Sequence, residues 1–149
     1  MIIVIDIKRL KTALINLQCE MVAQRNIVNP DYISWLQYDI LYQLNKQKEI
    51  LPSELSILLG TSRTKLSKAL KELKTLEYIQ QYPNKLDGRE LYTSISKKGG
   101  DFLNNVLEKH NSLCQTANEV LTKEEQDKFE ELANKVSNAL KEKRVNNYE

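Results

Sequence analysis

Proline and glycine are scarce in this chain, whose 149 residues include three prolines and four glycines. These two residues interrupt helices, whereas Leu, Lys, Glu and Gln, which are frequent here, favour them. The length is sufficient for one domain with its own hydrophobic core. We therefore expect residues 1–149 to form a single, mostly α domain of the α+β class.

Long apolar runs and cysteine clusters are also missing. The apolar run from Ile2 to Ile5 ends at Asp6, far short of the roughly 20 residues that a membrane-spanning helix needs. It is also too short for the core of a signal peptide. Cys19 and Cys114 stand far apart in the sequence and match neither a metal-ligand spacing nor a disulfide framework. We expect a cytoplasmic protein with reduced thiols and no membrane segment.

Signatures of catalysis are equally absent from the sequence. His110 is its single histidine, and there is no phosphate-binding glycine loop, zinc-ligand cluster or nucleophile elbow. Because His110 lies close to an apolar helical stripe, we expect it to be a partly buried or interface side chain. The sequence therefore predicts a protein that is not an enzyme and that uses no cofactor and no metal.

The stretch 52–76 has the pattern of two short helices separated by a glycine. Pro52 suits the first turn of a helix, and Gly60 tolerates the left-handed conformation that ends one. Thr61 or Ser62 supplies a side-chain oxygen that can cap the second helix. Its apolar positions recur at helical spacing and are Leu66, Ala69, Leu70, Leu73 and Leu76. This pattern is typical of a helix-turn-helix whose second helix is a recognition helix.

The opposite face of that second helix carries Lys and hydroxyl side chains. Residues 60–98 hold nine basic and four acidic residues, whereas residues 1–59 are neutral overall and residues 99–149 are net acidic. This concentration of positive charge predicts a contact with nucleic acid, with a merely solvated lysine face as the alternative. Lys74 and Thr75 lie too far along the helix and are expected to be solvated. The residues expected to meet phosphates or base edges are Ser62, Arg63, Thr64, Lys65, Ser67, Lys68 and Lys71.

Two helices and a short strand are predicted before this motif. Apolar spacing indicates a first helix over about 6–27 and a second that ends at Leu44. Asp31 or Ser34 can cap the second helix. Residues 49–51 are expected to form a short strand just ahead of the helix-turn-helix.

A hairpin and two more helices are predicted after it. Strands at 79–82 and 91–95 flank an Asp-Gly turn, which predicts a β-hairpin in the position of a wing. One long helix is expected from 97 to about 120. A last helix is expected to begin at Thr122, with Glu125 completing a capping box, and the tail from residue 141 is expected to be frayed. The fold predicted is a winged helix-turn-helix with a two-stranded wing.

Three segments around the wing resemble the MarR family of bacterial transcription regulators, including its SarA-like branch. Leu73–Ile79 ends the recognition helix, Asp87-Gly88-Arg89 stands at the wing tip, and Ile95–Gly99 leaves the second strand. The family has an Asp-x-Arg wing and a Leu-Thr-x-x-Gly-like exit at matching separations. Here Ile95-Ser96 replaces the usual Leu-Thr but keeps an apolar residue and a capping hydroxyl. Thr61 stands where an aliphatic residue is common.

The resemblance implies a homodimeric regulator, expected to be a repressor, that binds double-stranded DNA at a pseudo-palindromic operator. The recognition helix, 62–76, would lie in the major groove and Arg89 in the minor groove, with Asp87 placed to pair with Arg89. The DNA-binding part would span about 31–98. Terminal helices over about 6–27 and 99–141 would form the dimer interface. A winged-helix module that binds a protein instead of DNA is the alternative.

Two kinds of signal also follow from the resemblance. Some relatives sense oxidants through a cysteine in the first helix, which makes Cys19 a candidate redox sensor, whereas Cys114 is expected to be structural. A small core or interface cysteine is the alternative for Cys19, and an unchanged peroxide response in a Cys19→Ser variant would exclude sensing. The family also often binds small phenolic or lipophilic effectors. Trp35, Tyr38 and Met21 are candidate cleft residues, with ordinary core packing as the alternative.

Overall fold

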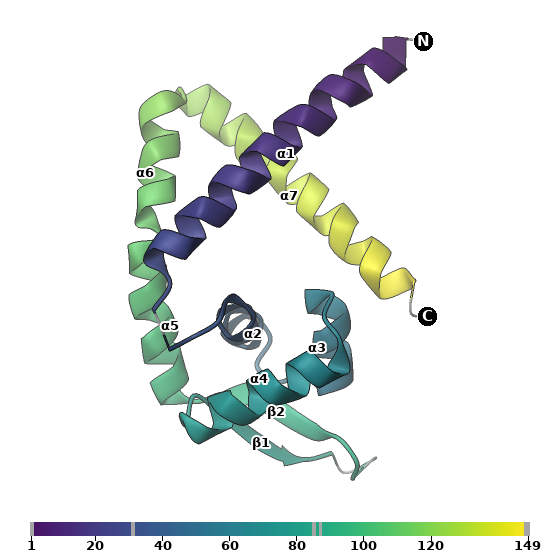
Figure 1. Cartoon of the computed structure of the whole chain (residues 1–149), viewed down its shortest axis with the longest axis vertical. Helices are drawn as coiled ribbons and strands as arrows, with labels where there is room; N and C mark the ends of the chain where they lie inside the picture. Colours follow the sequence, from purple (N-terminus) through teal and green to yellow (C-terminus); the bar gives the residue numbers. More distant parts are fainter. Residues whose placement is uncertain (1, 31, 85, 87, 148–149) are drawn as a thin grey trace.

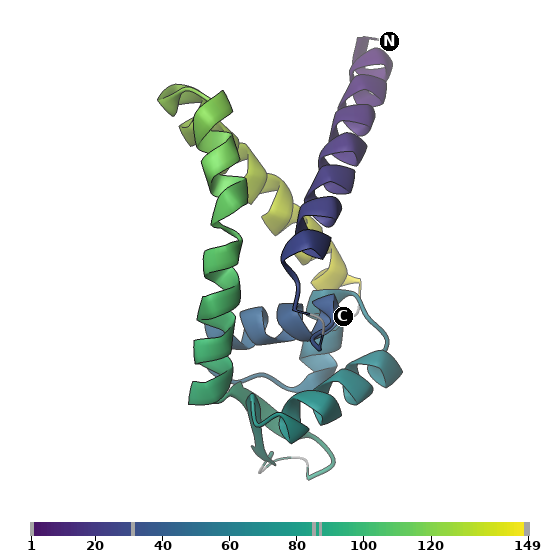
Figure 2. The ribbon, with the colours of Figure 1, turned by 60° about the vertical axis from the view of Figure 1, so that its left-hand side comes forward.

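Helices dominate the part of the chain that the computed structural model describes, residues 2–30, 32–84, 86 and 88–147. The winged-helix unit lies at one end, and long helices extend from it (Figure 1; Figure 2). The predicted winged helix-turn-helix framed by terminal helices is confirmed. In chain order the elements are α1 (Ile2–Val28), α2 (Trp35–Lys46), α3 (Pro52–Leu59), α4 (Arg63–Thr75), β1 (Ile79–Pro83), β2 (Leu91–Ile95), α5 (Lys97–Lys109), α6 (Asn111–Val120) and α7 (Lys123–Asn146).

Side-chain caps begin several helices at the positions that the sequence predicted. The Ser34 hydroxyl accepts the N–H of the third residue of α2. Ser62, and not Thr61, caps α4. Thr122 and Glu125 form the predicted capping box at the start of α7, where each side chain accepts the backbone N–H of the other. Because each cap satisfies a backbone N–H that has no partner inside its helix, these starts are determined locally.

The wing is a two-stranded antiparallel sheet, with Pro83 of β1 opposite Leu91 of β2. The strand predicted at 49–51 is reduced to a single bridge. Ile50 donates its N–H to Thr93 O and accepts from Thr93 N, at 3.0 and 2.9 Å. Even this short bridge joins the start of the helix-turn-helix to the middle of the wing.

The long helix predicted from 97 to 120 is wrong in one respect, because it divides at His110 into α5 and α6. Around the break, His110 N donates to Leu107 O and Leu113 N donates to His110 O, which are contacts of the tighter 3₁₀ type. The His110 ring stacks on Tyr38 with a centroid separation of 5.1 Å and lies 5.9 Å from the Trp35 ring. This packing against α2 is a tertiary contact that helical periodicity does not reveal.

The prediction of a frayed tail from residue 141 is also wrong, because α7 continues to Asn146. Near its end, Arg144 donates from its guanidinium to Leu58 O on α3 at 3.0 Å. Leu58 O is one of the last carbonyls of α3, which lack partners within the helix. The end of α7 is therefore held against the helix-turn-helix.

The hydrophobic core lies among α2, α3, α4, the wing and the first half of α5. Leu103 and Val106 of α5 belong to it, so the beginning of the predicted long helix packs within the winged-helix unit. The largest side chains that are less than 2% exposed are Ile40, Leu41, Leu44, Leu55, Leu66, Leu73, Leu103 and Thr93. This core fixes α4 relative to the wing.

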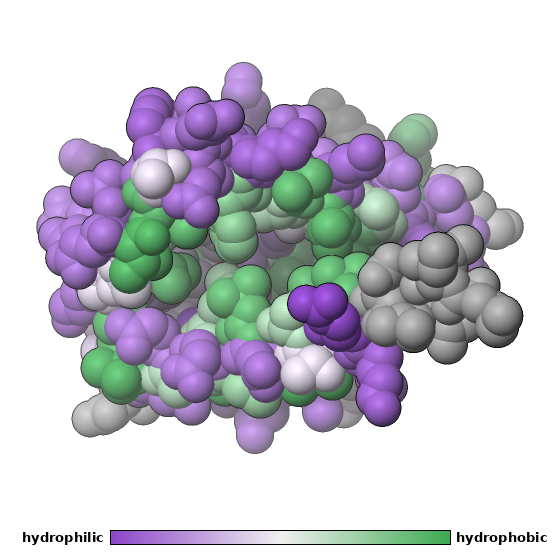
Figure 3. All heavy atoms as spheres, turned by 90° about the horizontal axis from the view of Figure 1, so that it is seen from above, coloured by the Kyte–Doolittle hydropathy of each residue, from purple (hydrophilic) through white to green (hydrophobic). Residues whose placement is uncertain are grey.

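Large apolar side chains on α1, α6 and α7 remain outside this core. They surround a hollow when the molecule is seen from above (Figure 3). Contiguous apolar patches of this kind on the surface of a protein commonly mark a surface that binds a partner. The exposed apolar residues of these helices are Ile7, Leu10, Leu14, Ile15, Leu17, Met21, Val22 and Ile27 on α1, Leu113 and Val120 on α6, and Phe129, Leu132, Val136 and Leu140 on α7.

Candidate nucleic-acid interface

Helix α4 is buried on one face and exposed on the other. Its side chains Leu66, Ala69, Leu70 and Leu73 are buried in the core. Because residues three and four apart share a helix face, burying this stripe turns the remaining positions outward. All seven positions predicted to contact nucleic acid from this helix and its cap are exposed: Ser62, Arg63, Thr64, Lys65, Ser67, Lys68 and Lys71.

The turn between α3 and α4 is fixed by its own backbone. Gly60 has the predicted left-handed conformation, with φ of 62°. Its N–H donates to Ile57 O at 3.2 Å, and Thr61 N donates to Ser56 O at 3.1 Å. These bonds satisfy the last carbonyls of α3 in the manner of a Schellman-type end. The direction in which α4 leaves α3 is therefore set locally.

A groove of about 420 Å³ lies between α4 and the wing. It brings Arg63, Ser67 and Lys71 of α4 together with Arg89 of the wing. Lys74 also lines the groove, although its place late in the helix had suggested a solvated role. The position of the wing beside the second half of α4 explains this difference, and no local sequence signal reports it.

The other predicted contacts lie outside this groove. Thr64, Lys65 and Lys68 are exposed on α4 but do not line it. Asp87 lies outside the described residues, so its pairing with Arg89 stays a prediction. Arg89 itself is exposed. The arrangement presents cationic side chains from a helix and from a hairpin on one side of the molecule.

Glu90 is a further groove residue that the sequence reasoning missed. Its carboxylate accepts hydrogen bonds from Ser53 N and Ser53 Oγ, both at 3.1 Å. Its backbone carbonyl accepts the N–H of Asn84 at 3.2 Å across the end of the wing. The sequence gives no reason to distinguish Glu90 from other acidic surface residues, because its hydrogen-bond partner Ser53 lies 37 positions earlier in the chain.

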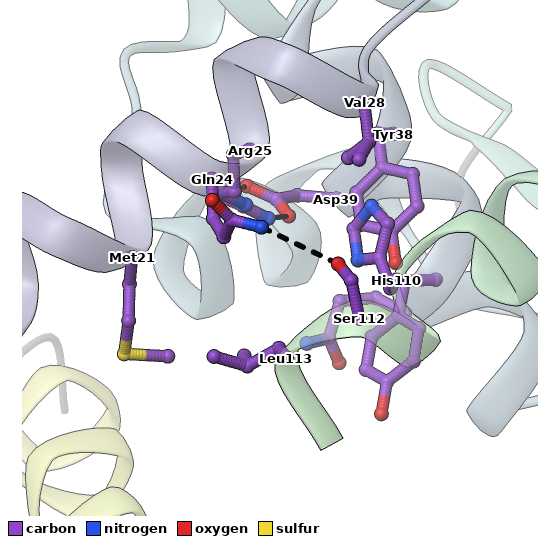
Figure 4. Close-up of a pocket in the computed structure, with 11 residues that line it drawn as sticks. Met21, Gln24, Arg25, Val28, Tyr38, Asp39, His110, Ser112 and Leu113 are labelled. Carbon is purple, nitrogen blue, oxygen red and sulfur yellow. Dashed lines mark hydrogen bonds and ion pairs between the residues drawn. The ribbon is translucent and has the colours of Figure 1, made fainter. Parts of the chain in front are cut away.

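A second cavity, of about 350 Å³, lies among α1, α2 and the α5–α6 break (Figure 4). Met21 and Tyr38 line it as predicted, and Trp35 packs edge-on against Tyr38 without being a lining residue. The Arg25 guanidinium lies 4.4 Å from the Trp35 ring centroid and forms an ion pair with Asp39. The cavity thus has an aromatic wall and one paired cation.

The polar groups of this cavity join α1 to the rest of the molecule. Gln24 donates to the Ser112 hydroxyl at 3.3 Å. Burial, and then the nearby Arg25 guanidinium, lower the pKa of the His110 imidazole from its ordinary value. Burial also raises the pKa of the Tyr38 hydroxyl. Both pKa shifts favour the neutral forms of the stacked His110 and Tyr38 rings, which suits an aromatic or apolar molecule.

Both cysteines are exposed. Cys19 lies on α1, where its predicted redox role stays a prediction. Cys114 lies on α6 and does not pack in the core, contrary to the structural role expected for it. Within the described ranges, no cluster of three or more His, Cys, Asp or Glu side chains is placed to hold a metal ion. None of the described helices is long and apolar enough to cross a membrane.

Comparison with known proteins connects this geometry to one family. Residues 33–90 match a family model described as "MarR family". The transcriptional repressor MprA of Escherichia coli K12 is 31% identical over 129 residues, which cover 84% of this chain and 73% of that protein. The match to the family model spans α2 through Glu90 and includes the residues that line the groove except Leu91.

Solved structures with the same fold include two DNA-binding regulators. A MarR variant from Escherichia coli in complex with operator DNA has a TM-score of 0.64 at 22% identity, over 84% of this chain and 91% of that one. Bordetella bronchiseptica BpsR, whose DNA binding is regulated by 6-hydroxynicotinic acid, has a TM-score of 0.72 at 15% identity, over 87% and 98%. At these identities the likeness establishes the fold.

Proposed function

The chain belongs to the MarR family of transcriptional regulators, and from this premise we propose that it is a homodimeric repressor that binds a pseudo-palindromic DNA operator. The observation that carries the proposal is the groove in which Arg63 and Lys71 of α4 lie on the same side as Arg89 of the wing. Two separate elements present cations to one external surface, which suits the two grooves of a DNA duplex.

Each predicted contact has a physical role in this proposal. The exposed first half of α4 enters the major groove, which is about 12 Å wide and admits a helix. Lys65 and Lys68 meet phosphates or guanine edges there. Arg89 enters the narrower flanking minor groove, whose negative potential is greatest at A·T-rich sequence. Asp87 holds the direction of Arg89.

A second copy of the chain is the proposed partner of the exposed apolar stripes. Helices α1 and α7, which carry these stripes, extend away from α4 (Figure 1; Figure 2). A two-fold axis through these helices would place two recognition helices on the same side of one duplex. Half-sites would then be separated by about one helical turn. The DNA-binding part, 31–98, and the terminal helices thus act together.

The test of this function is a salt series with the wild-type protein and an Arg89→Ala variant, on duplexes selected from genomic DNA. Wild-type affinity should fall with salt at a log–log slope of about −0.9 for each phosphate contacted. Arg89→Ala should bind about tenfold or more weakly and should lose its preference at the flanking A·T positions. Fluorescence anisotropy measures both quantities.

Lys128→Ala is the matched control, because it removes an exposed cation from α7, remote from the groove. It should bind like the wild type. A flat salt response of the wild-type protein would contradict DNA binding and would favour the protein-interaction module instead. An unchanged flanking preference in Arg89→Ala would contradict minor-groove reading by the wing.

We also propose that the cavity beside Tyr38 binds a small phenolic or lipophilic effector. Its aromatic wall, formed by Tyr38 and the stacked Tyr42 with ring centroids 6.3 Å apart, supports an aromatic ligand. The relative regulated by 6-hydroxynicotinic acid gives a first probe. A molecule held between α1 and α2 would change the angle between the dimer helices and the DNA-binding unit.

Thermal unfolding with 6-hydroxynicotinic acid and simple phenols tests this cavity. A ligand at about 100 times its Kd should stabilise the folded protein by about 2.7 kcal/mol. Leu113→Trp, which places a large ring at the cavity wall, should remove that stabilisation. Leu86→Trp is the control, since Leu86 is 95% exposed near the wing tip. Equal ligand stabilisation of both variants would place the ligand elsewhere, and the absence of any shift with the whole panel would contradict an aromatic effector.

A further inference from the structure

One carboxylate connects the wing to the first helix of the helix-turn-helix. Glu90 follows the wing tip and immediately precedes β2, which begins at Leu91. Both of its side-chain oxygens accept hydrogen bonds from the same residue, Ser53, one from the backbone N–H and one from the hydroxyl. Its own carbonyl accepts from Asn84 on the other side of the wing. Glu90 is thus tied to both strand ends and to α3.

The position of Ser53 makes this contact energetically favourable. It is the second residue of α3, after Pro52, so its N–H is among the donors that have no partner inside the helix. A carboxylate at a helix start also interacts favourably with the helix dipole, and hydrogen bonds to an ionised acceptor are stronger than neutral ones. At the same helix start, the Glu54 carboxylate accepts a hydrogen bond from the Leu51 N–H at 3.4 Å.

The surroundings of Glu90 show why its direction matters. It lines the same groove as Arg63, Lys71, Lys74 and Arg89. A carboxylate facing a phosphate would oppose the binding of DNA. Here both carboxylate oxygens are engaged by Ser53 and the side chain is half-buried, so the charge is directed toward α3.

We propose that Glu90 is a positioning residue that fixes the wing relative to α3, and thereby sets where Arg89 stands with respect to the recognition helix. The inference rests on the proposed function. Arg89 and Glu90 share a peptide bond, so their Cα atoms are held about 3.8 Å apart. Because α3 and α4 are joined by a fixed turn, a contact from Glu90 to α3 also sets the distance between the minor-groove and major-groove readers.

Glu90→Ala separates this role from a simple charge effect. The variant removes a negative charge from the DNA-facing side, so its affinity for non-specific DNA should stay equal or increase. Discrimination at the flanking A·T positions should nevertheless fall about tenfold, since a misplaced Arg89 no longer favours them. Discrimination at the central base pairs, read by α4, should be unchanged. Competition binding with duplexes altered at flanking or central positions measures all three quantities.

Two further variants test the partner and the chemistry. Glu90→Gln keeps an acceptor oxygen for Ser53 without the charge, and should retain most of the flanking discrimination. Ser53→Ala removes the hydroxyl bond but keeps the backbone one, so it should reduce the flanking discrimination less than Glu90→Ala does. The double variant Ser53→Ala with Glu90→Ala should reduce it no further than Glu90→Ala alone, because the Ser53 hydroxyl acts through the carboxylate that Glu90→Ala already removes. Glu119→Ala, which removes an exposed carboxylate from α6, is the control and should behave like the wild type.

The outcomes distinguish this inference from the proposed function. If Arg89→Ala loses the flanking preference while Glu90→Ala retains it, positioning by Glu90 is wrong and reading by the wing stands. If neither variant changes the preference, the wing does not read DNA and the proposed function itself is wrong in that part. A uniform loss of affinity in Glu90→Ala for all duplexes, with discrimination intact, would also overturn the positioning role.

Discussion

Val136→Asp is expected to convert the protein from a dimer to a monomer at micromolar concentration. Val136 lies in the middle of the exposed stripe on α7 and is 48% exposed in the single chain. In the proposed dimer this side chain would be covered, and an unpaired carboxylate there would lose its hydration at a cost of several kcal/mol. Light scattering measures the state of assembly directly.

The same variant should lose at least about 100-fold in operator affinity, because two linked recognition helices bind one duplex far more tightly than either does alone. Asn134→Asp adds the same charge at an exposed position two residues away on the same helix and should remain dimeric. Circular dichroism should show unchanged helix content in both variants, since Val136 is not part of the core. A dimeric Val136→Asp would remove α7 from the interface, and a monomeric wild-type protein would remove the dimer altogether.

Gly99→Ala is expected to be the most destabilising small substitution in the winged-helix unit. A Cβ atom at this position would lie 2.1 Å from Tyr78 O, 2.9 Å from Tyr78 C and 3.0 Å from Ile95 Cγ1. Tyr78 O is a backbone atom that already accepts Ser96 N at 3.0 Å, so it cannot rotate away. The whole start of α5 would have to move away from the wing.

We expect this change to lower the free energy of unfolding by about 3 kcal/mol, at the upper end for an overpacked site. The corresponding fall in Tm is about 10 °C for a chain of this size. Gly100→Ala is the matched control, because a Cβ there meets no atom within 4 Å. Alanine favours a helix over glycine by about 1 kcal/mol, so this neighbour should stabilise the protein. Similar shifts in both variants would contradict the close approach of α5 to the wing.

The fold was predictable to the extent that it depends on neighbouring residues. Ser34, Ser62 and Thr122 cap their helices through contacts within three residues of sequence, and Gly60 ends α3 through its own backbone freedom. The wing was predictable for the same reason, since it follows from two extended segments and the Asp-Gly turn between them. The apolar stripe of α4 also fixed which of its residues face outward, and with them most of the candidate site.

The errors occurred where a segment is controlled by distant contacts. Helical periodicity continues through His110, yet packing against Tyr38 and Trp35 accompanies the break between α5 and α6. Nothing in the local sequence of the charged tail predicts that it is helical, but Arg144 donates a hydrogen bond to Leu58 O, 86 positions earlier in the chain. Neither partner is visible from the surrounding sequence.

By itself, the sequence determined the order of the elements, the helix-turn-helix, the wing and the outward lysine face of α4. These features arise from interactions over a few residues, which composition and spacing report directly. Only the tertiary structure decided that Lys74 shares a groove with the wing, and that Glu90 is held by Ser53 and turned toward α3. Such relations depend on how separate elements pack around a common core, and local patterns do not encode the distance between them.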